Sequence, residues 1–142
     1  MSKKDELRVS KLVEENLNIE FQNHKYVLDK WGQVDNWCQI DKNTLLFLEV
    51  ETSQKHPNTN VLKVWPYLIE HNNYRVFMIQ TYFPFSPGLN SNRGRLSEWL
   101  GNELRRQISG RFEYNKVIID EKTDWSSIKE ELSFFKKKHI RP

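Results

Sequence analysis

The segment from Thr44 to Glu51 constrains the fold most, because four consecutive apolar residues run directly into two acids. Leu45-Leu46-Phe47-Leu48 has the length of a strand and is apolar on both faces, which is typical of a central strand covered on both sides. Glu49 and Glu51 follow at a spacing of two, so both side chains project from one face of that strand. Two unpaired carboxylates are costly beside a buried strand. The pair is interpreted as part of a functional site, with a solvated sheet face as the alternative.

The rest of the chain alternates between helical and strand-like patterns, which predicts one α/β domain spanning residues 1–142. The predicted elements are a helix over 3–18, strands over 26–28, 33–40 and 44–51, a helix with its apolar stripe at 61, 62, 65, 68 and 69, a strand over 74–83, a helix with its apolar side at 96, 100 and 104, a strand over 112–119 and a final helix over 128–135. Pro66 should kink the second helix if that helix begins as early as Asn60. Ser126 or Ser127 is expected to cap the last helix.

Composition excludes several classes of protein. The 142 residues include 18 aromatic side chains, which is enough apolar surface for a core and argues against disorder. No apolar run approaches the roughly 20 residues that a bilayer requires, and the charged N-terminus does not resemble a secretory signal, so a cytoplasmic location is predicted. A single cysteine, Cys38, excludes an internal disulfide framework, and the four histidines lack the spacing of a zinc site.

A hairpin is predicted to bring a third carboxylate to the pair. If residues 41–43 form a three-residue connection, Ile40 lies opposite Thr44, and every opposed pair of residue numbers sums to 84. Asp35 then faces Glu49 directly. The apolar side chains of residues 34, 46, 48 and 50 are expected mainly on the other face of the sheet.

Opposed like charges destabilise paired strands unless a cation compensates them. Oxygen ligands select hard divalent ions such as Mg²⁺, Mn²⁺ or Ca²⁺. Asp35, Glu49 and the backbone carbonyl of Val50 are the candidate ligands.

This pattern resembles the PD-(D/E)xK nuclease superfamily, in which an Asp on one strand precedes a Glu-x-Lys element on the next. Here Asp35 is followed by Glu49-Val50-Glu51, and the order of predicted elements matches over roughly residues 3–83. Val34 replaces the Pro of the motif, and Glu51 stands where the Lys is usual, a Glu-x-Glu variant of the motif. The resemblance implies a restriction endonuclease-like α-β-β-β-α-β core with a central mixed sheet flanked by helices.

The resemblance also implies an endonuclease dependent on Mg²⁺ or Mn²⁺ that hydrolyses phosphodiester bonds of DNA, with Asp35 and Glu49 as metal ligands. Glu51 would orient or deprotonate the attacking water, or bind a second ion. Lys63 is a rival for this catalytic role, since some members of the superfamily carry the catalytic Lys on the following helix. An ordinary solvent-exposed lysine is the alternative for Lys63. Glu14 or Glu15 stands where some members supply a further acid.

Candidate contacts to nucleic acid lie outside this centre. Lys55 follows the motif and could touch phosphate or be a plain loop residue. Arg95 and Arg106 lie on one stripe of a predicted helix, either to track phosphates or only to keep the helix soluble. Basic residues also outnumber acidic ones by 12 to 8 after Leu89, a distribution compatible with DNA or RNA.

Size bears on partners, since so small a nuclease would need a homodimer to cut both strands. An alternative function follows from the missing Lys. It is a catalytically inactive module on the same fold that binds nucleic acid or joins a larger complex.

Overall fold

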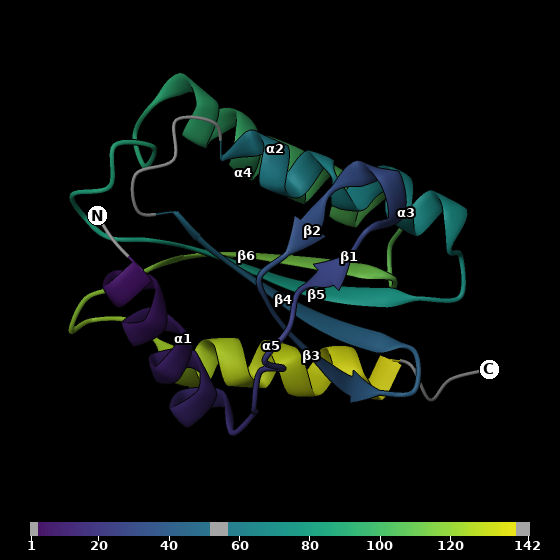
Figure 1. Ribbon diagram of the computed structural model, residues 1–142, viewed down its shortest axis with the longest axis horizontal. Coiled ribbons are helices and arrows are strands. Elements are labelled where there is room, and N and C mark those ends of the chain that lie inside the picture. Colours follow the sequence, from purple (N-terminus) through teal and green to yellow (C-terminus); the bar gives the residue numbers. More distant parts are fainter. Residues whose placement is uncertain (1–2, 52–56, 139–142) are drawn as a thin grey trace.

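The apolar segment 44–51 forms β4 (Thr44–Glu51), an inner strand of a four-stranded sheet (Figure 1). The structure is a computed structural model that describes residues 3–51 and 57–138. The strand order is β3-β4-β5-β6, where β3 (Asn36–Asp41) runs antiparallel to β4, and β5 (Arg75–Tyr82) and β6 (Phe112–Ile118) run parallel to it. Every residue of β5 is buried, as expected for a strand covered on both faces. The prediction of an α/β fold with a mixed sheet is confirmed.

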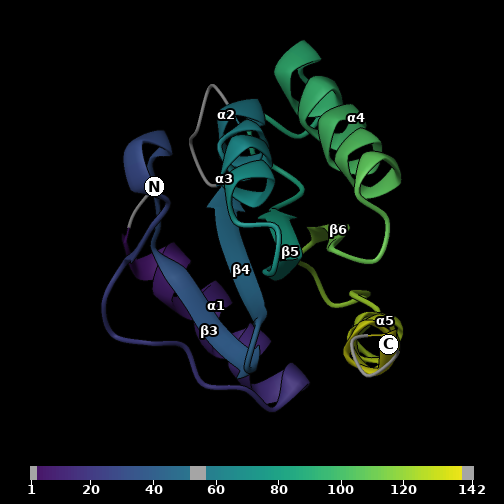
Figure 2. The ribbon, with the colours of Figure 1, turned by 90° about the vertical axis from the view of Figure 1, so that its right-hand side faces the viewer.

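Helices cover both faces of this sheet (Figures 1 and 2). The lower face, named from its place in Figure 1, is covered by α1 (Lys3–Leu17) and α5 (Trp125–Lys138). The upper face is covered by α2 (Asn58–Leu62), α3 (Val64–Glu70) and α4 (Asn92–Gln107). Among the described residues, no helix is long and apolar enough to cross a membrane.

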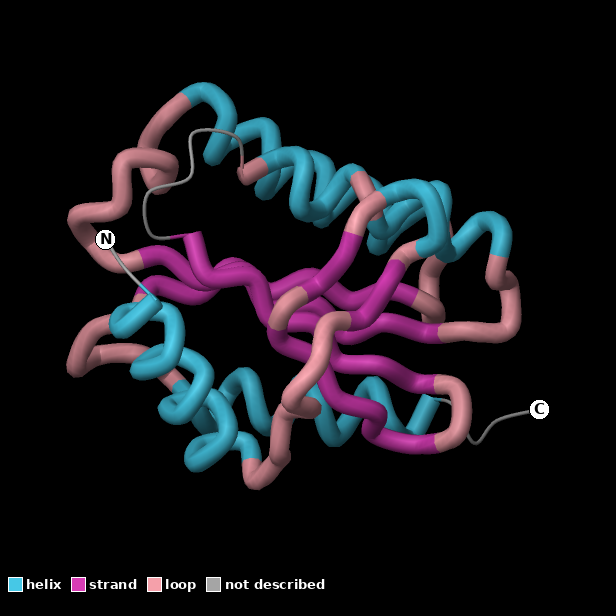
Figure 3. The backbone as a smooth tube through the Cα atoms, viewed as in Figure 1, coloured by secondary structure: helices cyan, strands magenta, loops and turns pink. Residues whose placement is uncertain are grey.

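The predicted strand over 33–40 is wrong as a single element, because it is interrupted at Asp35. Its first part is β2 (Gln33–Val34), which pairs with β1 (Tyr26–Val27) in a separate two-stranded sheet beside the main one (Figure 3). A 3₁₀ turn (Asp29–Trp31) joins β1 to β2. Val34 belongs to the apolar cluster on the upper face, so its predicted place on the lower face is also wrong. Because the Val34 side chain is buried in the upper-face cluster, β2 does not continue in the direction of β3.

The hairpin register holds over most of its length but differs at the turn. Asn36 pairs with Leu48 and Cys38 with Leu46, as the sum of 84 predicts. At the turn Asp41, and not Ile40, pairs with Thr44, and the register shifts between Gln39 and Asp41. The connection is therefore two residues long, and the extra residue of an irregular, bulge-like pairing restores the predicted register.

The residues that cover the upper face form two short helices in place of one. α2 ends at Leu62, and α3 begins at Val64. Pro66 has no backbone N–H to donate to the carbonyl of Leu62, so the helical ladder is interrupted there, and the predicted kink is confirmed. Leu62 and Ile69 are exposed, although the sequence pattern placed them in the apolar stripe. The interruption redirects the stripe to Val61, Val64 and Leu68.

α4 approaches the sheet through small residues. Its buried positions are Gly94, Ser97, Gly101 and Leu104. The predicted apolar side is correct at Leu104 and at Leu100, which is partly buried against the upper-face cluster, but Leu96 is exposed. A Cβ on Gly101 would lie 2.3 Å from the ring of Tyr114, a distance that only glycine avoids. This close approach brings Ser97 within hydrogen-bonding reach of the sheet.

The final helix begins earlier than predicted. Asp124 caps α5, because its Oδ1 accepts hydrogen bonds from the Ser127 N–H at 3.0 Å and from the Ser126 hydroxyl at 2.9 Å. The predicted cap at Ser126 or Ser127 is therefore wrong, although the helix carries its apolar residues on the predicted side. An acid before the first turn also suits the positive end of the helix dipole.

Candidate functional site

Glu49 and Glu51 lie on the upper face of β4, as the two-residue spacing predicts. They continue the row of Leu45 and Phe47, which pack beneath α3 and α4 in the apolar cluster of the upper face. Glu51 is 2% exposed, and the Glu49 side chain is 13% exposed. Two carboxylates thus stand where the row would otherwise continue as apolar core.

Lys63 reaches this pair from the break between α2 and α3. Its Nζ lies 3.0 Å from Glu49 Oε2 and donates hydrogen bonds to the carbonyl oxygen of Gln33 at 2.7 Å and to Asn60 Oδ1 at 3.1 Å. The side chain is only 16% exposed. The alternative of an ordinary solvent-exposed lysine is therefore wrong. The structure brings this sequence-predicted residue together with Glu49.

Glu51 is held through one of its two oxygens. Its Oε2 accepts hydrogen bonds from Asn60 Nδ2 and Gln80 Nε2, each at 2.8 Å. Its Oε1 is buried and has no hydrogen-bond partner among the described residues. A buried carboxylate oxygen without a donor loses its hydration without replacement. Within the described part of the chain, Glu51 Oε1 is therefore an unsatisfied acceptor.

Gln80 connects this carboxylate to the rest of the upper face. Besides Glu51, its Nε2 donates to the carbonyl oxygen of Pro57 at 3.0 Å. Its Oε1 accepts from the hydroxyls of Ser97 at 2.7 Å and of Tyr114 at 2.6 Å. The amide is fully buried, and both its nitrogen and its oxygen are hydrogen-bonded. Gln80 therefore fixes the position of Glu51 relative to α4 and β6.

Sequence reasoning missed Asn60, Gln80, Ser97 and Tyr114. For Gln80 a signal existed, since a carboxamide interrupts the apolar segment 76–79 on the face that also holds Val76 and Met78. Its register partner on β4 is Glu49. For Ser97 the signal was its spacing from Gly94 and Gly101, which forms a small-residue stripe.

Burial dominates the electrostatics of the two acids. Desolvation raises the pKa of Glu49 to about 8, although the ammonium of Lys63 acts in the opposite direction. The charges of Glu51 and, more weakly, Asp35 raise the pKa of Glu49 further. Desolvation also raises the pKa of Glu51, against the hydrogen bonds from Gln80 and Asn60. Both effects show that the site does not fully compensate its negative charge.

Asp35 lies apart from the two glutamates. It occupies the bend between β2 and β3, so the ladder ends one pair short of the predicted contact with Glu49. Its side chain is 53% exposed and lies 3.8 Å from Lys25 Nζ. Within the described residues, no three acidic, histidine or cysteine side chains are grouped closely enough to hold a metal ion. Val50, the other predicted ligand, packs its side chain against the lower-face cluster.

The remaining candidates have ordinary local partners or lie elsewhere. Lys55 is outside the described residues. Arg95 donates to the carbonyl oxygen of Asn90 and to Asn92 Oδ1, and Arg106 pairs with Glu103 at 3.0 Å. Both arginines are exposed, as predicted. Glu14 accepts a hydrogen bond from the N–H of Phe21 at 2.8 Å and so holds the chain that leaves α1.

Comparison with known proteins identifies no relative: no family model, curated protein or solved structure matches the chain.

Proposed function

We propose that this protein is a metal-dependent endonuclease of the PD-(D/E)xK type that hydrolyses phosphodiester bonds of DNA. The observation that carries the proposal is Glu51 Oε1, a buried carboxylate oxygen with no hydrogen-bond donor among the described residues, two residues along β4 from the largely buried carboxylate of Glu49. Apolar side chains in those positions would stabilise the fold more. Their retention is explained by a ligand that takes carboxylate oxygens.

The donor set suits a hard divalent cation. Glu49 and Glu51 would hold Mg²⁺ or Mn²⁺ through carboxylate oxygens, with the Val50 carbonyl and water as further ligands, whereas Asp35 lies apart from them. When bound, such an ion would polarise the scissile phosphate and lower the pKa of a water molecule.

Lys63 supplies the cation that the Glu-x-Glu variant lacks on β4. Its ammonium is held in place by the Gln33 carbonyl oxygen, Asn60 Oδ1 and Glu49 Oε2. It therefore lies at the site although its backbone is not part of β4. From this position it would stabilise negative charge on the phosphate. Glu51, oriented by Gln80 and Asn60, is the group that would accept a proton from water.

The topology supports the same proposal for the fold. An antiparallel hairpin, β3–β4, carries the acids, and α2 and α3 then lead to the parallel strand β5. This arrangement agrees with the restriction endonuclease-like α-β-β-β-α-β core, except that β1 and the separated β2 lie outside the main sheet. The two acids lie at the carboxyl end of β4. We further propose that a homodimer forms where both strands of DNA are cut.

The test is cleavage of supercoiled plasmid and labelled oligonucleotides in Mg²⁺, Mn²⁺ or EDTA. We expect cutting only with metal, and a loss of at least about 100-fold in Glu49→Ala and Lys63→Met. Glu130→Ala is the matched control, since Glu130 is exposed on α5. Cutting that survives in both site variants would contradict the proposal. Salt-sensitive DNA retention without cutting would favour an inactive binding module.

A further inference from the structure

An exposed aromatic ring lies at the tip of the turn that follows β5. Phe85 is 63% exposed, although it is large and apolar. One face of its ring stacks on Phe83, with ring centroids 5.0 Å apart and the planes only 3° from parallel. Phe83 itself is buried in the lower-face cluster. The protein therefore supports one face of the Phe85 ring and leaves much of the side chain open to solvent.

The turn holds this ring in a fixed position. The Ser86 N–H donates to the carbonyl oxygen of Phe83 at 3.0 Å, and the Ser86 hydroxyl oxygen accepts from the Phe83 N–H at 2.9 Å. Pro84 occupies the first central position of the turn, where its fixed φ is favourable. The Phe85 ring is therefore preorganised, so little conformational entropy would be lost in ordering it when a ligand binds.

A cation lies close to this stack. The Arg8 guanidinium of α1 lies 5.1 Å from the centroid of the Phe83 ring. Its side chain is 58% exposed, and its ion pair with Asp5 is long, at 3.9 Å. Arg8, Phe83 and Phe85 thus combine a positive charge with an open aromatic face. We call these three residues the Phe85 platform.

The platform and the carboxylates lie at the same end of the molecule. Glu51 pairs with Tyr82 across β4 and β5, and Phe85 follows Tyr82 by three residues, a path of at most about 11 Å. Figure 1 shows the turn after β5, the first turn of α1 and the carboxyl end of β4 together at its left side. A strand bound at the carboxylates could reach the platform within a few nucleotides.

We propose that the Phe85 platform binds an unpaired base of single-stranded nucleic acid, a base near the phosphate to be cut. This inference rests on the proposed nuclease function. A ring can contact the face of a base only where that base is unstacked, so the platform selects single-stranded segments over continuous duplex. Phenylalanine offers no hydrogen bond to a base edge, so the contact is indifferent to sequence. Arg8 would bind the neighbouring phosphate.

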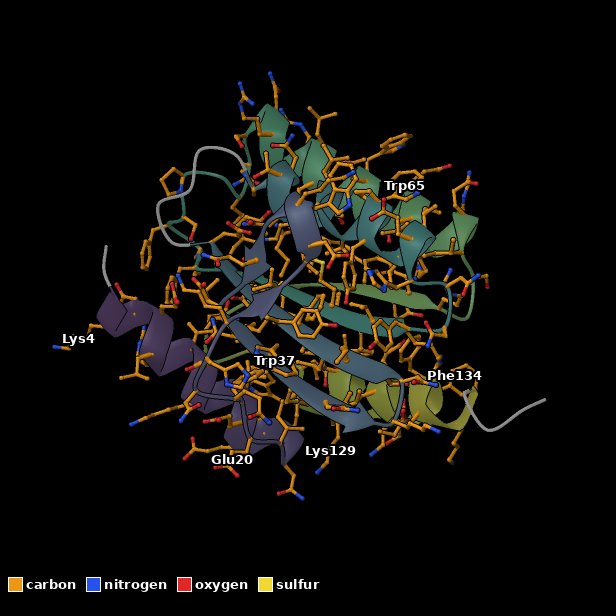
Figure 4. The ribbon with its side chains drawn as sticks, turned by 45° about the vertical axis from the view of Figure 1, so that its right-hand side comes forward. Lys4, Glu20, Trp37, Trp65, Lys129 and Phe134 are labelled. Atoms are coloured by element: carbon orange, nitrogen blue, oxygen red, sulfur yellow. The ribbon has the colours of Figure 1, made fainter. Side chains whose placement is uncertain are left out.

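Binding without turnover tests this inference. The probe is a fluorescein-labelled 12-nucleotide oligo-dT in EDTA, compared by anisotropy with a hairpin duplex of the same length. Phe85→Ala should raise the Kd for the single strand about tenfold, because stacking contributes about 1–3 kcal/mol per base, and should leave the duplex Kd unchanged. Phe85→Trp should retain the affinity. Phe134→Ala is the matched control, since Phe134 is 60% exposed on α5, far from this turn (Figure 4).

An oligonucleotide with abasic positions separates stacking from charge. It should bind the wild type as weakly as intact oligo-dT binds Phe85→Ala, and Phe85→Ala should weaken its binding no further. Equal affinity of Phe85→Ala and wild type for oligo-dT would overturn the inference, as would an equal loss on duplex. If binding depends on Phe85 but no cutting occurs in metal, the nuclease proposal fails and the platform stands. If cutting and single-strand binding are both independent of Phe85, only the platform fails.

Discussion

The two faces of the sheet differ in the side chains that they bury. The lower face holds an apolar cluster from Val9 of α1 to Phe135 of α5, and the buried Arg75 beside it donates hydrogen bonds to the Thr44 hydroxyl and to the carbonyl oxygens of Gly110 and Phe135. The upper face has an apolar cluster of similar extent, but this cluster ends at a polar network that holds two buried acids, a lysine and a fully buried amide. The two faces differ in how well their buried charges are compensated. The Arg75 guanidinium is hydrogen-bonded, whereas Glu51 Oε1 has no hydrogen-bond partner among the described residues.

This difference separates stability from function. Apolar burial contributes about 25 cal/mol per Å², whereas buried charge contributes little net stability or lowers it. The upper face keeps Glu49 and Glu51 despite that cost. Sites that break the rules of packing are where function is expected. The lower face is therefore mainly structural away from the Phe85 platform at its edge, and the upper face, which we call the working surface, carries the proposed catalytic groups.

The largest expected effect comes from the lower face. Phe77 is fully buried there and lies 5.7 Å from Phe135, ring centroid to centroid. Phe77→Ala should lower the free energy of unfolding by about 3–5 kcal/mol, measured by urea denaturation. Metal-dependent activity per folded molecule should stay unchanged. Phe77→Leu, a milder change, should cost about 1 kcal/mol. A loss of activity that exceeds the loss of folded protein would break the division between the two faces.

Gln80→Leu should have a smaller effect on stability and a larger one on function. The change leaves the hydroxyls of Ser97 and Tyr114 without their acceptor and removes one of two donors to Glu51. Each buried group left unpaired costs about 1–3 kcal/mol, so we expect a loss of about 2–4 kcal/mol in unfolding experiments.

Activity of Gln80→Leu per folded molecule should fall at least tenfold, because Glu51 loses its orientation. Met78→Leu, two residues earlier on the same face, is the control and should change neither quantity much. Unchanged kcat in Gln80→Leu would mean that Glu51 is positioned without it.

What the sequence predicted well depends on short-range geometry. Two-residue periodicity along a strand placed Glu49 and Glu51 on one face, and the missing N–H of Pro66 predicted the break in the helix. The hairpin register was right for Asn36 to Gln39, although the turn assumed for it was wrong. An error at the turn was cancelled by the irregular pairing beside Ile40.

What the sequence did not predict depends on contacts between distant segments. Gln80 meets Glu51 only because β5 runs parallel to β4 in one register, and that register is set by the packing of α2 and α3 between them. Asp35 was placed opposite Glu49, but burial of Val34 ended the strand first. For Lys63 the sequence left open a catalytic role or an ordinary exposed lysine, because only tertiary packing brings it to Glu49. The fold class needs only local pattern, whereas the site needs tertiary packing.

The buried charge of Glu49 makes stability depend on pH. Its pKa is about 8 in the folded protein, against an ordinary value of 4.5. The folded state therefore binds more protons than the unfolded state between about pH 4.5 and 8, and stability falls as pH rises through this window. Above pH 8 the full cost of the buried charge remains.

Glu49→Gln mimics the protonated acid, so it should be more stable than the wild type by about 1–3 kcal/mol at pH 8.5 in EDTA. The two proteins should converge near pH 4.5. Thermal melts across that range would check this, with Glu130→Gln as the exposed control. A Glu49→Gln variant less stable than the wild type at pH 8.5 would show that the ion pair with Lys63 outweighs desolvation.

The smallest expected effect on stability concerns Arg106, at the last turn of α4 on the upper side. Its side chain is 72% exposed and pairs with Glu103 on its own helix, so Arg106→Ala should change the free energy of unfolding by less than about 0.5 kcal/mol. If DNA lies along the working surface, this variant should lower the slope of log affinity against log salt concentration by about one. Lys129 on α5 is equally exposed but belongs to the lower side (Figure 4), so Lys129→Ala should leave the slope unchanged. Equal slopes for the two variants would assign DNA binding to overall charge and would remove α4 from the proposed interface.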